Sequence, residues 1–144
     1  MSFNSKQNIE PIYYSNENFE LLYSTIEKFS NSKKIKFRKI TDQNELADTI
    51  IFNFKTQKLA DKCVESLAKV GVGTKNIPDA MKWHFNKHFT QIWNNTPYYK
   101  NYKSAWAKSD ELLTRSVSLP VMVNWSEEDC KIFGQKVLNV LNSI

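Results

Sequence analysis

The chain has 144 residues, a length that suits one compact domain and is short for two. Hydrophobic residues make up 41% of it and charged residues 24%, which excludes a disordered, collagen-like or disulfide-scaffold protein. Twenty lysines and arginines against fifteen aspartates and glutamates give a net charge of +5, a moderately basic balance that does not by itself favour nucleic-acid binding.

Two features bear on the cellular compartment. Cys63 and Cys130 are too few for a disulfide framework, and both fall at apolar positions of predicted helices, so a reducing, cytoplasmic environment is expected. Residues 1–6 contain no apolar signal core, and no stretch approaches the roughly 18 apolar residues of a membrane span. We therefore expect a protein that is neither secreted nor membrane-spanning.

The N-terminal third begins with an arm and continues with an amphipathic helix. Residues 1–15 are polar and contain Pro11, which predicts a flexible arm ahead of a single domain over residues 16–144. The next apolar residues recur at helical spacing and form one stripe: Phe19, Leu22, Tyr23, Ile26 and Phe29. This helix should end near the polar run 30–34. Its apolar face is expected to contribute to an exposed patch through which the chain self-associates or recruits a partner.

Two strands and a second helix are predicted next. Segments 35–40 and 49–54 alternate apolar and polar residues, which predicts neighbouring antiparallel strands. Thr56 is suited to cap a following helix, and Gly71 suits the left-handed residue that ends it. The apolar stripe of this helix is Ala60, Cys63, Val64, Leu67 and Ala68.

The middle of the chain has weaker periodicity. Residues 72–75 are predicted to form a short strand or an extended stretch, and Pro78 suits the first turn of a short helix that reaches about His84. Residues 86–111 predict short helical turns within a long loop. Aromatic and basic residues alternate in this part of the chain. The aromatic rings could stack on bases or sugars while the lysines bind phosphates, or the stretch could form a covered protein interface. We favour the interface.

The C-terminal part predicts a strand followed by a helix. Apolar residues alternate from Val117 to Val123, and Pro120 favours an edge position because it has no amide donor. Ser126 and the acidic residues after it predict the start of a helix that continues to the end of the chain. The order of these elements predicts an α+β fold, with a small antiparallel or mixed sheet of three to four strands and helices mainly on one face.

Most catalytic signatures are missing from the sequence. Gly71-Val72-Gly73 lacks the third glycine of a dinucleotide-binding loop, and there is no nucleophile elbow. His84 and His88 have the spacing of metal ligands on a helix, but Phe85 replaces the glutamate of a zinc protease and no third ligand is evident, so no metal site is expected. One histidine would then be structural and the other exposed, or one would contact a ligand. No catalytic residue is assigned.

In combination, several segments resemble the C-terminal small domain of DegT-type sugar aminotransferases. The resemblance covers about residues 35–144 and includes segments 48–54, 71–80 and 112–120, Trp83-His84-Phe85, and the acidic helix capped by Ser126. Its sharpest parts are the stretch ending in Trp83-His84-Phe85 and the strand Arg115-Ser116-Val117-Ser118-Leu119-Pro120. The resemblance implies the fold of the small domain of fold-type I aminotransferases, which agrees with the α+β prediction.

In that family, a large domain supplies the lysine that holds pyridoxal phosphate, and the small domain closes over a nucleotide-linked sugar. The resemblance therefore implies transamination of a keto-sugar, a step of polysaccharide biosynthesis. Nothing in this chain matches the lysine segment, so we expect it to be inactive alone and to need a large cofactor-binding domain in cis or in trans. Pyridoxal phosphate is expected only when that domain is supplied.

If the resemblance holds, five residues are candidates for contact with the substrate: Lys75, Asn76, His84, His88 and Arg115. Each also has an ordinary structural interpretation. Lys75 would be a solvated lysine, Asn76 a turn residue ahead of Pro78, and Arg115 an ion-pair partner for Asp110 or Glu111. The competing function is a non-enzymatic module that binds a phosphate-bearing ligand or a protein partner through the aromatic and basic stretch.

Overall fold

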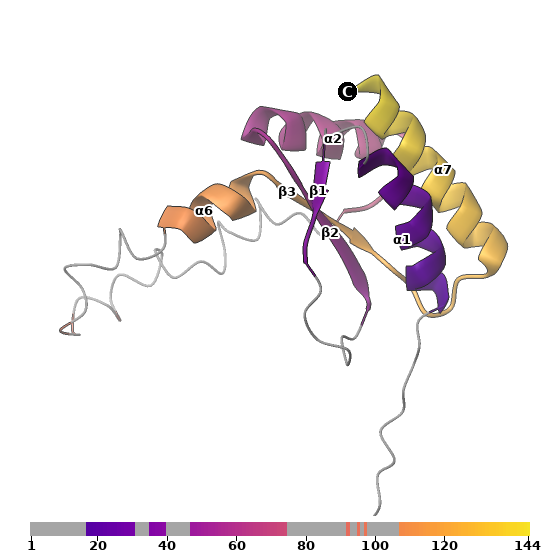
Figure 1. Ribbon diagram of the computed structural model, residues 1–144, viewed down its shortest axis with the longest axis horizontal. Helices are drawn as coiled ribbons and strands as arrows, with labels where there is room; N and C mark the ends of the chain where they lie inside the picture. Colours follow the sequence, from indigo (N-terminus) through magenta and orange to yellow (C-terminus); the bar gives the residue numbers. More distant parts are fainter. Residues whose placement is uncertain are drawn as a thin grey trace, which may run out of the picture.

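The computed structural model describes residues 17–30, 35–39, 47–74 and 107–144, together with residues 92, 95 and 97. Its elements are α1 (Glu17–Ser30), β1 (Ile35–Phe37), β2 (Thr49–Phe54), α2 (Gln57–Lys69), α6 (Ala107–Thr114), β3 (Ser116–Pro120) and α7 (Glu127–Ser143). Helices α1 and α2 pack on the sheet and α7 packs on both of them (Figure 1). The predicted α+β fold is confirmed, and the described part contains three strands. The arm over residues 1–15 lies outside the described residues.

The three strands form an antiparallel sheet in the order β1-β2-β3. In its register, Ile35 lies opposite Phe54, and Phe52 lies opposite both Phe37 and Val117. Since successive side chains of a strand point to opposite faces, β2 buries every second residue, which are Ile50, Phe52 and Phe54. The predicted antiparallel pairing is confirmed for Ile35–Phe37, so β1 is shorter than the predicted segment 35–40, whose last residue lies outside the described residues.

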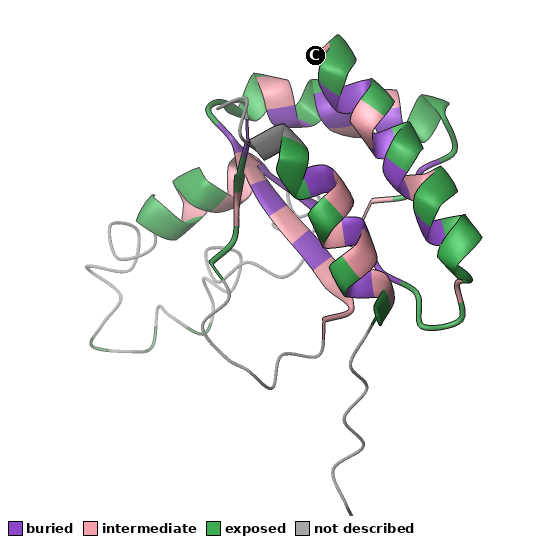
Figure 2. Ribbon diagram, turned by 45° about the vertical axis from the view of Figure 1, so that its right-hand side comes forward, coloured by how far each residue is buried: buried purple, intermediate pink, exposed green. Residues whose placement is uncertain are grey.

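The core lies between this face of the sheet and the helices (Figure 2). Strand β2 contributes Phe52, which is fully buried and lies in a row of aromatic rings with Phe37 and Phe54. Helix α1 contributes Phe19, Leu22 and Ile26, each at most 5% exposed. The prediction that the apolar face of the first helix is exposed is wrong for these residues, because α7 and the sheet cover them.

Helices α1 and α7 begin at the same end of the molecule and run in the same direction (Figure 1). The Asn18 side-chain amide donates to the carbonyl oxygens of Met122 and Trp125, at 3.0 and 2.9 Å, just before α7 begins. Further along, a Cβ built on Gly134 would lie 3.1 Å from Cγ2 of Thr25. The glycine therefore lets the two helices approach closely.

The predicted caps of α2 are present. The Thr56 hydroxyl accepts a hydrogen bond from the amide of Leu59, and Gly71 has a positive φ of 74° just beyond the last turn. Glycine adopts this left-handed conformation without steric cost, which explains why the helix ends here. Residues 72–74 belong to no strand, although Val72 is buried, and the helix predicted from Pro78 lies outside the described residues.

Two elements near the C-terminus differ from the sequence prediction. Residues 107–114 form α6, whereas the sequence predicted short helical turns within a long loop over residues 86–111. No residue of α6 is buried, so the helix has no apolar stripe packed in the core. Strand β3 ends at Pro120, and Val123 lies outside it with 68% of its surface exposed. A turn between Met122 and Trp125 ends the extended chain and leads into α7. Within the described sheet β3 is an edge strand, as Pro120 predicted.

Helix α7 begins with a capping box. The Ser126 hydroxyl accepts from the Asp129 amide at 3.1 Å, and the Asp129 carboxylate accepts from the Ser126 amide at 2.9 Å. Hydrogen bonds from Ser126 lower the pKa of Asp129 below its ordinary value of 3.8. The sequence predicted the serine cap, and the structure adds the reciprocal bond.

None of the described helices is both long enough and apolar enough to cross a membrane.

We expect Ser126→Ala to destabilise the protein in a pH-dependent way. Because the pKa of Asp129 is lowered by folding, its contribution is present above its ordinary pKa and is lost as pH falls through the lowered value. The stability difference between wild type and Ser126→Ala should therefore be constant near neutral pH and shrink below pH 3.8. Urea unfolding at a series of pH values measures it. A difference that grows in acid would contradict this assignment.

Candidate functional site

Of the five candidate site residues, Arg115 is the one that the structure describes. Lys75, Asn76, His84 and His88 lie outside the described residues, as does most of the aromatic and basic stretch. The site can therefore be built only around Arg115 and the elements that meet there. These are the end of β2, the end of α6 and the start of β3.

Arg115 lies between α6 and β3, and its backbone and side chain both contact the end of β2. The guanidinium Nη1 donates to the carbonyl oxygen of Phe54 at 2.9 Å, and the Arg115 carbonyl accepts from the Phe54 amide at 2.9 Å. The Arg115 amide donates to the carbonyl of Leu112 at 3.3 Å. These contacts fix the half-buried side chain at the end of the sheet. Its Nε atom is buried and has no hydrogen-bond partner among the residues that the structure describes.

Polar side chains beside Arg115 connect the sheet to α6. Ser116 is 1% exposed, and its hydroxyl lies within hydrogen-bond distance of Asn53 Oδ1 and, at 2.7 Å, of the Leu112 carbonyl oxygen. The single hydroxyl proton serves one of these two acceptors at a time. The Asn53 amide donates in turn to the carbonyl of Lys36 on β1 at 3.3 Å. A row of polar contacts therefore runs from β1 across the sheet to the end of α6.

The alternative interpretation of Arg115 was an ion pair with Asp110 or Glu111. Within the described part of the chain, Arg115 forms neither pair. Asp110 lies on α6, and its carboxylate oxygen Oδ1 is buried without a hydrogen-bond partner in the described ranges. The guanidinium thus bonds to a neutral backbone carbonyl, and no described carboxylate neutralises it. A positive charge held in this way suits a carboxylate or phosphate group of a ligand.

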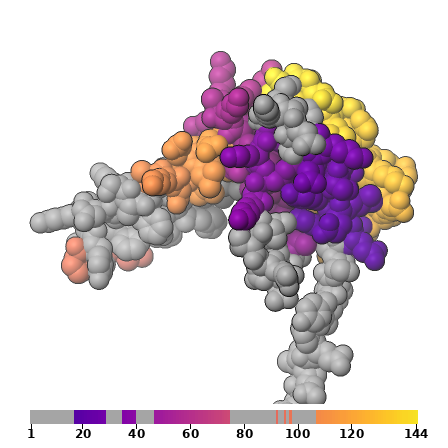
Figure 3. All heavy atoms as spheres, in the orientation of Figure 1, coloured from indigo at the N-terminus to yellow at the C-terminus, as the bar shows by residue number. Residues whose placement is uncertain are grey.

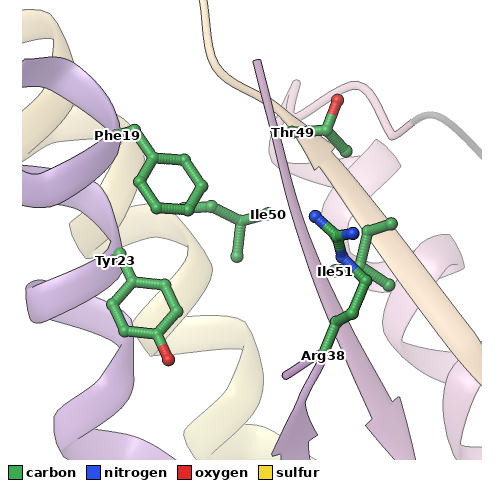
Figure 4. Close-up of a pocket in the computed structure, with 6 residues that line it drawn as sticks. All are labelled: Phe19, Tyr23, Arg38, Thr49, Ile50 and Ile51. Atoms are coloured by element: carbon green, nitrogen blue, oxygen red, sulfur yellow. The ribbon is translucent and has the colours of Figure 1, made fainter. Parts of the chain in front are cut away.

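A shallow pocket lies between α1 and β2 (Figure 4). The rings of Phe19 and Tyr23 line the α1 side, with centroids 5.6 Å apart, and Arg38 lies on the opposite side near Ile51. Burial, followed by the charges of Glu27 and Glu20, raises the pKa of Tyr23. The pocket has a volume of about 10 Å³, which is room for about one water molecule. It is therefore too small to be a cofactor or sugar site.

The described cysteines and acidic residues do not form a reactive centre. Cys63 is buried in α2, where desolvation raises its pKa to about 12, so it remains a thiol at neutral pH. Cys130 is also buried, and burial with the charges of Asp129 and Glu127 raises its pKa. Across the described ranges, no group of three or more histidine, cysteine, aspartate or glutamate side chains could hold a metal ion.

The space-filling view shows α6 at one side of the described molecule, away from α1 and α7 (Figure 3). The sequence singled out Arg115 but missed Asn53 and Ser116. Their signal is weak because a polar residue that alternates with buried ones is typical of a solvent-facing position. Only the register, which places Asn53 opposite Ser116, shows that they meet.

No known family model matches this chain, and no curated protein matches it.

Proposed function

We propose that this chain is the C-terminal small domain of a pyridoxal-phosphate-dependent nucleotide-sugar aminotransferase and closes the active site over the sugar substrate. The observation that carries the proposal is the position of Arg115. It immediately precedes β3, within segment 115–120, which is one of the sharpest parts of the resemblance to DegT-type enzymes, and its guanidinium donates to the Phe54 carbonyl. The α+β fold, with helices α1 and α2 packed on the antiparallel sheet, is consistent with such a small domain.

In this function, Arg115 binds an anionic group of the substrate and the sheet holds the guanidinium in place. Val117 and Leu119 anchor β3 in the core, and Ser116 ties it to α6, so the charge is presented from a rigid element. Pyridoxal phosphate, when bound by the large domain, supplies the electron sink for the amino-group transfer. The described residues contribute binding and orientation.

The lysines that the structure describes support a dependence on a second domain. Every lysine whose burial the structure describes is exposed: Lys28, Lys36, Lys39, Lys55, Lys58, Lys62, Lys69, Lys108, Lys131 and Lys136. A lysine that reacts readily with a cofactor aldehyde needs a desolvated pocket that lowers its pKa. None of the described lysines has such a surrounding. The large cofactor-binding domain, in cis or in trans, is therefore part of the proposal.

We expect the isolated chain to form no stable covalent adduct with pyridoxal phosphate. Borohydride reduction after incubation with the cofactor, followed by peptide mapping, should show weak labelling spread over several lysines. The same treatment of the chain unfolded in urea is the control, because it reports the intrinsic reactivity of the lysines. Stoichiometric labelling of one lysine in the folded chain alone would contradict the need for a second domain.

The proposal itself is tested with the chain isolated under native conditions from the cells that produce it, through an affinity tag. We expect a second domain to be present, in the same polypeptide or as a partner, that yields a phosphopyridoxyl-lysine peptide after borohydride reduction. The preparation should also transaminate a nucleotide-linked keto-sugar. Absence of the cofactor peptide from every species recovered would overturn the aminotransferase assignment. A partner without it, or nucleotide bound when no cofactor peptide is recovered, would favour the binding-module function.

In the active preparation, Arg115→Ala should lower kcat/KM for the nucleotide-linked sugar by about 10- to 100-fold, because the substitution removes one hydrogen bond to a charged group of the substrate. Arg115→Lys, which keeps the charge without the planar fork, should recover part of this loss. Lys108→Ala is the matched control, since Lys108 is an exposed cation on the adjacent α6. Unchanged kcat/KM in Arg115→Ala would remove this residue from the site.

A further inference from the structure

We draw no further inference here: the strongest candidate, the exposed loop of Met122 and Val123 between β3 and α7, is a small unpartnered apolar surface, and nothing in the structure shows what covers it.

Discussion

Replacing Phe52 by alanine should lower the free energy of unfolding by about 3–5 kcal/mol, the typical cost of removing a buried phenylalanine side chain. Phe52 is fully buried on the central strand β2, and its ring contacts the rings of Phe37 and Phe54, with centroids 6.1 and 5.7 Å away. The substitution removes contacts to both neighbours and leaves a cavity between the sheet and the helices. Since whole domains are stable by only about 5–15 kcal/mol, much of the stability would be lost.

Urea unfolding followed by circular dichroism measures this loss. Phe52→Leu keeps part of the apolar volume and provides a milder variant, with a smaller loss expected than for Phe52→Ala, should Phe52→Ala not fold. Val123→Ala is the matched exposed control, because Val123 is 68% exposed and its truncation should change the free energy by less than about 0.5 kcal/mol. Equal losses for Phe52→Ala and Val123→Ala would show that Phe52 is not in the core.

Gly134→Val should destabilise the protein by about 1–3 kcal/mol, although valine has a higher helix propensity than glycine. Gly134 is buried in α7, and an added Cβ would lie 3.1 Å from Thr25 Cγ2 and 3.3 Å from Leu22 Cδ1. The branched side chain would force α1 and α7 apart and disturb the core below them. Gly73→Val is the control, because a Cβ at Gly73 has open space around it.

A double-mutant cycle identifies the cause of this effect. Thr25→Ser removes the methyl group that crowds Gly134 and keeps the hydroxyl that donates to the Leu21 carbonyl at 2.8 Å. Gly134→Val should therefore be tolerated better in the Thr25→Ser background than in wild type. Unfolding free energies of the two single variants and the double variant measure the coupling. Strict additivity would show that crowding between Thr25 and residue 134 is not the cause.

The candidate site was only partly predictable from the sequence. Arg115 was selected through the resemblance of its strand, but its partner, the Phe54 carbonyl, is 61 residues away. A contact over this distance depends on how β2 and β3 pair, and no local pattern specifies it. The choice between a ligand-facing arginine and an ion pair with Asp110 or Glu111 was open for the same reason. The other four candidates, Lys75, Asn76, His84 and His88, remain predictions.

The sequence by itself determined the elements whose signals are local. Thr56 and Gly71 mark the ends of α2, Ser126 marks the start of α7, and alternation of apolar residues identifies β2, because caps and side-chain periodicity depend on residues only a few positions apart.

Only the tertiary structure decided how these elements meet. It placed α1 and α7 side by side in the same direction, with Gly134 leaving room for their close approach. It also buried the α1 face that the sequence left exposed. It also joined Asn53 to Ser116 across the sheet and fixed Arg115 on the Phe54 carbonyl. Each of these features is a contact between residues that are distant in the chain. Such contacts stabilise the protein only once the core has assembled.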